Sequence, residues 1–480
     1  MEYQKNKNHY LYGYGENFPA DGLTNIANAG ANLDAYSSFG DWANLSYLGM
    51  VNYNFQGKYI VDLTFRREGS SRFTNDLRFG NFGSVGAAWN IKQESFLKDI
   101  DFIDNFRLRA SYGYSGSSSI STNSYQALLA YDADYADNGA IYPSQFGNGM
   151  LTWEKNRNFD IGTDFAFLDN RISGSFAYYD KYTYDLLQAV PLSRTTGHNS
   201  QNQNIGEVSN TGIELELTGE IIRTKDFKWS ISGNYATVHN EVLALAKDGN
   251  GDDINIQTGS RKVEVGHSIY AWHMRKWAGV DPDNGEALWY LDGVSGETTN
   301  SYYDAEETFQ GGSAIPKYSG GVSTHIEFKG LYVDASVYFA GGHKVYEDWA
   351  FYTHHAGIYS TLYYQGVESL MQRWQKPGDI TDVPKQEFTG SSNTSRTSTR
   401  FLYDGDYVRL KDLVLGYNIP KSALSAIGFD AANIFVRGTN LFTWVKDDRL
   451  AYDPEVRADG FTRLTTPPVK SIVFGVNLNF

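Results

Sequence analysis

Cysteine is absent from this chain of 480 residues, and long apolar runs are absent as well. Without cysteine, no thiolate can complete a metal site. No stretch approaches the roughly 18 consecutive apolar residues that a membrane-spanning helix needs, which excludes a protein that crosses a membrane with helices. The first thirty residues contain no apolar h-region, so no signal peptide is expected in them. The formal net charge of −15 argues against nucleic acid as a partner.

Catalytic motifs are also missing. We find no hydrolase elbow, phosphate loop or zinc-protease helix motif, and no other catalytic constellation. His343, His354 and His355 could bind a metal, but no cysteine or well-spaced carboxylate completes a set, so solvated loop histidines are favoured. The acidic run at Asp248 lacks the glycine and glutamate of a calcium loop and is interpreted as an ordinary loop. We predict no enzymatic activity, no metal and no cofactor.

Apolar and polar residues alternate along much of the chain. Successive side chains of a strand point to opposite faces, so a period of two indicates strands with one apolar face. Glu214 and Glu216 alternate with isoleucine and leucine, and Arg107 and Arg109 alternate with phenylalanine, leucine and alanine. Such charges are costly in the dry core of a soluble barrel and tolerated in a wide, water-filled one. We therefore favour a membrane barrel and predict that these four side chains face its lumen.

About thirteen strand segments can be followed, with a possible fourteenth at Tyr10, Tyr12 and Tyr14. They lie near residues 46–55, 58–66, 80–92, 105–115, 157–168, 171–181, 209–222, 226–239, 318–328, 331–341, 406–419, 432–444 and 469–480. Short turns alternate with long connections, as in barrels with short periplasmic turns and long outer loops. The long loops are expected near 116–156, 182–208, 240–317, 342–405 and 445–468, within a barrel region of 46–480. Residues 1–45 are expected to form a loop and a possible partial strand.

The last ten residues, SIVFGVNLNF, alternate almost without fault and stop on an aromatic residue. In bacterial outer-membrane barrels, the insertion machinery reads a final strand of this kind. We therefore expect Phe474, Val476, Leu478 and Phe480 to form the insertion signal. This strand is expected to descend, with Phe480 on the periplasmic side.

Several longer segments occur in a specific order. They are KYIVDLTFRREGSSRF from Lys58, FGSVGAAWNI from Phe82, FRLRASYGYSG from Phe106, LTWEKNRNFDIGTDFAFLDN from Leu151, IGEVSNTGIELELTG from Ile205, DGDYVRLKDLVLGYNIP from Asp404, FVRGTNLFTW from Phe435 and YDPEV from Tyr452. In this order and spacing, the chain from about residue 46 onward resembles the SusC/RagA-like TonB-dependent transporters of Bacteroidetes outer membranes. Each segment alone is a weak pattern, and together they are specific.

The resemblance implies an all-β fold, a transmembrane antiparallel β-barrel of about 22 strands occluded by an amino-terminal plug. It covers only the carboxyl-terminal part of such a protein, so the plug is expected to be absent from this chain. It also implies a place in the cell outer membrane in contact with lipid. The implied partners are a SusD-like surface lipoprotein and the TonB–ExbB–ExbD energy complex.

Aromatic side chains of the long loops are the candidate substrate contacts, because aromatic faces suit the C–H faces of sugar rings. Girdle anchoring and contact with the capping lipoprotein are the alternative roles. The candidates are Trp272, Trp277, Trp289, Tyr290, Trp349, Tyr352, Tyr363, Tyr364 and Trp374.

Import of a large nutrient is the expected function, with an oligosaccharide favoured as substrate. An oligopeptide, which RagA-like members import, is the alternative, and nothing in the sequence separates the two. A structural or adhesion barrel that uses its loops for protein contacts is a further alternative. An outer-membrane enzyme is disfavoured by the missing catalytic set.

Overall fold

The computed structural model describes residues 1–480 except 24, 358–364, 388–392, 425–428 and 464. The chain divides into two compact units. Unit 1 comprises Met1–Ala87, Ser111–Phe159 and Tyr182–Glu207, and unit 2 comprises Ala88–Ala110, Asp160–Lys181 and Val208–Phe480. Within the described part of the chain, no helix combines the length and apolar character needed to cross a membrane.

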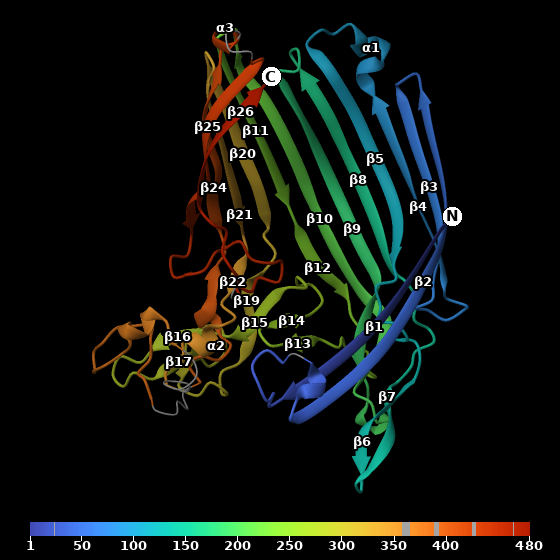
Figure 1. Cartoon of the computed structure of the whole chain (residues 1–480), viewed down its shortest axis with the longest axis vertical. Helices are drawn as coiled ribbons and strands as arrows, with labels where there is room; N and C mark the ends of the chain where they lie inside the picture. The colour runs from blue at the N-terminus through green and yellow to red at the C-terminus, as the bar shows by residue number, and fades with distance from the viewer. Residues whose placement is uncertain (24, 358–364, 388–392, 425–428, 464) are drawn as a thin grey trace. The chain divides into compact units, whose positions relative to one another are not determined.

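The largest sheet has fifteen strands (Figure 1). Fourteen follow each other in hydrogen-bonded order, and β12 (His239–Ala244) pairs with β10 beside this order. The fourteen are β1 (Glu2–Glu16), β2 (Ala31–Phe55), β3 (Tyr59–Ser70), β4 (Phe79–Asn90), β5 (Ile103–Ser117), β8 (Glu154–Phe167), β9 (Ile172–Pro191), β10 (Ser200–Arg223), β11 (Phe227–Thr237), β20 (Tyr318–Phe328), β21 (Leu331–Gly341), β24 (Tyr407–Ile419), β25 (Ala431–Val445) and β26 (Ser471–Asn479). The all-β prediction is confirmed, and the strand number agrees with the count made from alternation.

The remaining elements are short and lie in the connections. The strands are β6 (Leu128–Tyr135), β7 (Asn138–Gln145), β13 (Ile256–Thr258), β14 (Arg261–Val263), β15 (Ala271–Arg275), β16 (Trp277–Val280), β17 (Ala287–Tyr290), β18 (Thr298–Thr299), β19 (Glu307–Ser313), β22 (Lys344–Tyr346) and β23 (Leu402–Asp404). The helices are α1 (Ser95–Lys98), α2 (Ala350–Thr353) and α3 (Lys421–Leu424), with 3-10 turns at Ile26–Asn28, Ile91–Gln93, Arg194–Thr196, Glu368–Gln372 and Thr399–Phe401.

Two strand boundaries differ from the predicted ones. β9 runs to Pro191 and β10 begins at Ser200, so most of the expected loop 182–208 lies in strands. Most of residues 1–45 also lies in strands, because β1 pairs with β2 from Glu2 to Glu16. Backbone ladder hydrogen bonds continue a strand whether or not it has an apolar face. Residues 200–204 are polar on both faces and residues 186–190 are apolar on both, so neither segment alternates although the strand persists.

Strand register sorts the side chains of unit 2 into two faces. One row of directly opposed residues crosses seven strands and is polar throughout: Thr218, Ser232, Ser323, Ser336, Asp412, Thr439 and Ser471. A row on the other face is apolar throughout: Ile222, Trp229, Ile326, Val333, Leu415, Val436 and Phe474. The sheet of unit 2 therefore has a polar face and an apolar face.

The residues of the predicted insertion signal follow this apolar face. Phe474, Val476 and Leu478 pair with Val436, Ile434 and Ala432 of β25, respectively. Phe474 is 82% exposed and Phe480 is 95% exposed. An exposed apolar face over several strands is what a barrel presents to lipid. Their recognition by the insertion machinery stays a prediction.

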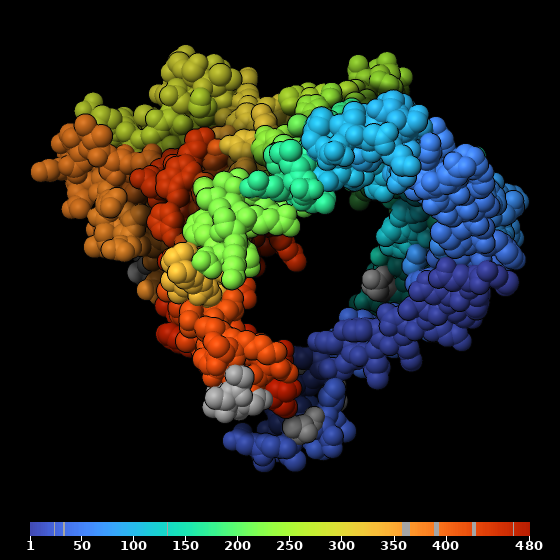
Figure 2. Space-filling model, turned by 90° about the horizontal axis from the view of Figure 1, so that it is seen from above, coloured from blue at the N-terminus to red at the C-terminus, as the bar shows by residue number. Residues whose placement is uncertain are grey.

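Short and long connections leave opposite ends of the strands in unit 2 (Figure 1). The turn between β20 and β21 is Lys329-Gly330, with φ of +50° and +90°. A two-residue hairpin of this kind needs positive φ at both positions, which glycine adopts without strain. The long connections 238–317 and 342–406 leave the other end. Figure 2 shows these two segments, coloured yellow-green and orange, side by side.

The two faces can be tested with adjacent residues of β20. Val322 is 47% exposed on the apolar face, and Ser323 follows it on the polar face. We expect Val322→Arg to destabilise the folded protein in lipid by about 2–4 kcal/mol, because the guanidinium enters hydrocarbon. Ser323→Arg is the matched control and should change stability little. Urea unfolding in lipid bilayers measures both. Equal losses in the two variants would contradict the assignment of faces.

Candidate functional site

Two arginines predicted to face the lumen share one carboxylate. Arg107 Nη2 lies 2.6 Å from Asp164 Oδ2, and Arg109 Nε lies 3.4 Å from Asp164 Oδ1. β5 and β8 bring the three side chains to one face of the sheet in unit 2. A Cβ added at Gly162 would lie 3.1 Å from Cζ of Arg109, so the glycine makes room for this guanidinium. The cluster carries one net positive charge.

The two predicted glutamates lie on the polar face of unit 2. Glu214 and Glu216 line a groove of about 260 Å³ together with Tyr338. A second groove of about 300 Å³ shares Glu216 and Tyr338 and extends to Lys411. Its wall contains the hydroxyl side chains Ser232, Ser323 and Ser336. The grooves thus offer carboxylates, hydroxyls and one ammonium group to a ligand that forms hydrogen bonds. Exposure of these groups to a transport path stays a prediction.

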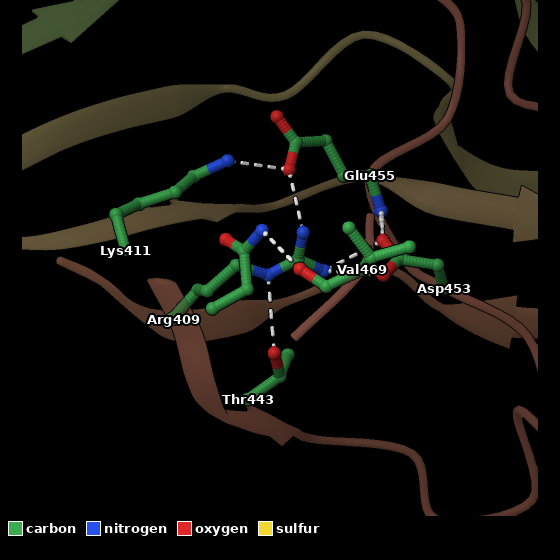
Figure 3. A network of polar contacts seen from close by, with 7 residues as sticks. Arg409, Lys411, Thr443, Asp453, Glu455 and Val469 are labelled. Carbon is green, nitrogen blue, oxygen red and sulfur yellow. Dashed lines mark hydrogen bonds and ion pairs between the residues drawn. The ribbon is translucent and has the colours of Figure 1, made fainter. Parts of the chain in front are cut away.

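Arg409 of β24 holds the segment after β25 against the polar face (Figure 3). Its Nη2 donates to both carboxylate oxygens of Asp453, each at 2.6 Å, and its Nη1 donates to Glu455 Oε2 at 2.8 Å. Nε donates to Thr443 Oγ1 at 3.1 Å, and Lys411 Nζ lies 2.6 Å from the same oxygen of Glu455. Arg409 is only 1% exposed. This buried cation is therefore fully neutralised by the segment that it holds.

Removal of this cation should release the segment 446–470. In Arg409→Met, Asp453 loses its counter-ion and Glu455 retains only Lys411, and we expect a loss of about 2 kcal/mol or more in folding stability. Arg437→Gln is the matched control, because Arg437 pairs with Asp412 on the same face but its side chain is 52% exposed. The control should lose no more than about 1 kcal/mol. Trypsin cleavage after Lys446, Arg449, Arg457 or Arg463 should accelerate only in Arg409→Met. Similar cleavage of both variants would refute a special role for Arg409.

Two of the candidate aromatic side chains are buried among the long connections of unit 2. Trp272 is 0% exposed and packs with Tyr346 and Phe401, and Trp289 is 1% exposed and packs with Tyr302. Their burial favours a structural role. Substrate contact by any of the loop aromatics stays a prediction.

The other described candidates are partly accessible. Trp349 and Tyr352 lie together with ring centroids 5.2 Å apart. Tyr290 lies beneath the ammonium group of Lys276. Trp374 donates from Nε1 to a backbone carbonyl of the segment 281–286 and covers Gly285. Tyr363 and Tyr364 lie outside the described residues.

Trp277 has a different role, because its side chain contacts two charged side chains. Its indole Nε1 donates to Asp382 Oδ1 at 2.6 Å. The guanidinium of Arg400 lies over the Trp277 ring, with Cζ 5.1 Å from the centroid, and at the same distance from the Phe401 ring. Trp277 therefore joins the loop 238–317 to the loop 342–406 and contacts both a cation and an anion of the second loop.

Arg400 and Asp382 line a cavity of about 560 Å³, here called the charged loop pocket. Its lining residues are His354, Ser369, Gln372, Asp382, Val383, Arg400, Phe401, Tyr403, Asp448 and Arg449. Arg400 is 6% exposed, and burial lowers the pKa of its guanidinium to about 10. Sequence reasoning gave no signal for this pocket, because its residues come from segments far apart in the chain. Asp453, Glu455 and Arg409, in contrast, occur in the segments YDPEV and DGDYVRLKD that carry the family resemblance.

The predicted loop histidines do not form one cluster. His354 Nε2 lies 2.9 Å from Glu347 Oε1, whereas His343 is buried beside Gly405. His355 is also buried, so the expectation of solvated loop histidines is wrong for His343 and His355. Among the residues that the structure describes, no group of three or more histidine, aspartate or glutamate side chains is placed to hold a metal ion. Asp248 accepts backbone N–H groups of Asn250 and Asp252, which is the geometry of a turn.

Burial of His343 makes the loop 342–406 sensitive to pH. Desolvation lowers the pKa of His343 below its ordinary value, and the charges of Asp406 and Asp404 oppose this effect only in part. The unfolded state therefore binds the proton at a higher pH than the folded state. The stabilisation by neutral His343 is complete above the unfolded pKa, about 6.5, and is lost as pH falls through the folded pKa.

Hydrogen exchange of this loop should thus become faster as pH falls below about 6.5, after correction for the intrinsic exchange rate. His343→Gln should flatten the dependence, since the side chain no longer titrates. His239→Gln is the control, because the His239 side chain is 75% exposed. An unchanged pH profile in His343→Gln would refute the assignment.

Comparison with known proteins gives a consistent result. Residues 1–441 match the family described as TonB dependent receptor-like, β-barrel. The chain is 30% identical over 524 aligned residues to TonB-dependent receptor P3 of Formosa agariphila, an alignment that covers 100% of this chain and 50% of that protein. It is 37% identical over 226 residues to TonB-dependent receptor SusC of Bacteroides thetaiotaomicron, over 45% of this chain and 22% of SusC.

Solved structures agree with these relatives. The RagAB peptide importer in its open-open state superposes with a TM-score of 0.84 at 28% identity, and the match covers 100% of this chain and 52% of that chain. The closed-closed state gives a TM-score of 0.82 with the same identity and coverage. The chain spans about half the length of the Formosa relative and of the importer chain.

Proposed function

The chain belongs to the TonB dependent receptor-like β-barrel family, and on this premise we propose that it is the carboxyl-terminal part of a SusC/RagA-type transporter that imports a large nutrient. The observation that carries the proposal is the separation of faces in unit 2. Seven consecutive strands present an unbroken polar row on one face and an unbroken apolar row on the other. A barrel wall between lipid and a wet passage requires this arrangement.

The polar face supplies the wall of the passage in this proposal. Hydroxyl groups in its seven-residue row pair with each other, as Thr218 with Ser232 and Ser323 with Ser336, at 3.0 Å in both cases. Paired hydroxyls exchange hydrogen bonds with a passing solute without presenting an uncompensated charge. Arg107, Arg109 and the glutamates of β10 would add charged contacts at other positions along the passage. In this proposal, the gate of the passage is the plug of the full-length transporter.

The long connections of unit 2 are proposed to face outward and to receive the substrate. The segments 238–317 and 342–406 contain all of the candidate aromatics, and most residues that line the charged loop pocket lie in the second segment. A SusD-like lipoprotein would cover this side, and the TonB–ExbB–ExbD complex would act on the plug from the periplasm. The short turns, including Lys329-Gly330, and the carboxyl terminus would then be periplasmic.

Two substrate classes compete. The loop aromatics favour an oligosaccharide, yet Trp272 and Trp289 are buried and offer no open ring face in this structure. The likeness to the RagAB peptide importer, at a TM-score of 0.84 and 28% identity, favours an oligopeptide. We propose the same TonB-energised transport for either substrate.

Energised import predicts that uptake depends on TonB. In cells that express the full-length protein, uptake of a labelled substrate should fall to background when TonB is deleted and return when TonB is restored. A protonophore should have the same effect as the deletion. The measurement is the initial uptake rate. Undiminished uptake without TonB would refute the proposed transport, and it would instead point to a passive or structural barrel.

A further inference from the structure

We propose that the charged loop pocket binds a peptide segment that carries both a carboxylate and an ammonium group. This inference deepens the proposed transport function, on which it rests, by naming the substrate class. The cavity of about 560 Å³ falls within the usual range for small-ligand sites. The charged side chains that line the cavity, rather than its volume, determine the proposed ligand.

A buried cation forms the floor of the pocket. Arg400 is 6% exposed, and its Nη1 donates to the carbonyl oxygen of Thr394 at 3.0 Å. Among the described residues, no carboxylate forms an ion pair with it. A guanidinium has five N–H donors, and those of Arg400 that face the cavity can bind a carboxylate in the paired geometry that the two planar groups favour. The floor therefore selects an anionic group.

The rim carries charge of the opposite sign. Asp382 and Asp448 are exposed at the pocket, and Asp448 forms no hydrogen bond or ion pair with the described residues. Arg449 is also at the rim, but Asp447 neutralises it through two hydrogen bonds of 2.9 and 2.8 Å. The free charge at the rim is thus negative. It attracts an ammonium group and repels a second anion.

Trp277 fixes the distance between floor and rim. Its ring supports the Arg400 guanidinium, and its Nε1 holds Asp382 at 2.6 Å. A ligand meets both charges already in position, so little ordering entropy opposes binding. Trp277 is therefore a positioning residue in this pocket.

The same features disfavour an oligosaccharide at this position. Stacking on a sugar requires an open aromatic face, but Phe401 and Tyr403 are only 1% and 5% exposed. A uronic acid would satisfy Arg400 and meet repulsion from Asp382 and Asp448. A peptide with a free carboxylate and a free ammonium group satisfies both signs. The pocket chemistry therefore favours a peptide.

Calorimetric titration of the full-length, detergent-solubilised protein tests this inference. The probe is tetra-alanine, with its amidated and its N-acetylated forms as controls for each charge. Tetragalacturonate and maltotetraose represent anionic and neutral glycans. We expect tetra-alanine to bind, and amidation or acetylation to weaken binding about tenfold or more, which corresponds to one lost charge-assisted hydrogen bond. The glycans should not compete.

Variants assign each charge to a residue. In Arg400→Gln, tetra-alanine should bind about tenfold or more weakly, and amidation should have no further effect. In Asp448→Asn, acetylation should lose its effect in the same way. Arg396→Gln is the matched control, since Arg396 is an exposed arginine of the same loop. If Arg400→Gln fails to fold, the exposed Asp448 and the modified peptides still decide the outcome.

Either of two results would overturn the inference: binding of a glycan in preference to tetra-alanine, or peptide affinity that neither substitution alters. Binding in detergent does not require TonB, so the two proposals fail separately. Intact peptide binding without TonB-dependent uptake would overturn transport. TonB-dependent uptake with no peptide binding would overturn the pocket assignment alone.

Discussion

The antiparallel ladder of backbone hydrogen bonds is the constraint on which the rest of this structure depends. Each paired residue of one strand lies opposite a defined residue of the next. The face on which a residue of β10 lies therefore fixes the face of its counterparts in the six further strands up to β26. A shift by one residue would place carboxylates and hydroxyls against lipid, where unpaired polar groups are costly. The register therefore produces the apolar outer surface and the polar wall at the same time.

A β-bulge interrupts the ladder between β21 and β24. Ser336 faces Asp412, and the next residue, Val337, faces Leu410, so Lys411 forms a bulge in β24. Before the bulge, the odd-numbered residues of β24 lie on the polar face. After it, the even-numbered residues do. Arg409 and Asp412 consequently lie on the same face, although their numbers differ in parity. Bulges re-aim side chains in this way near functional regions, and here Arg409 receives the segment after β25.

Burial of charge organises the loops of unit 2. Arg409 is neutralised by Asp453 and Glu455, which makes its segment a fixed part of the wall. Arg400 is also buried, but it contacts aromatic rings and a carbonyl group in place of a carboxylate. A buried cation without a paired anion is costly, and a ligand that supplies the anion removes part of this cost. The two arginines thus illustrate a structural and a binding use of the same side chain.

Periodicity in the chain was sufficient for the all-β class, the number of strands and the alternation of short and long connections, because these follow from local side-chain patterning. It also predicted that Glu214 and Glu216 face the lumen. In the register both lie on the polar face of β10, and their exposure to a lumen stays a prediction. Strand extensions around 182–208 were missed because neither alternates: residues 186–190 carry apolar side chains on both faces, and residues 200–204 are polar on both. The charged loop pocket and the burial of Trp272 depend on contacts between segments more than 70 residues apart, such as Trp272 with Lys344 and Trp277 with Asp382. Long-range packing of this kind has no local signature, so only the tertiary structure could reveal it.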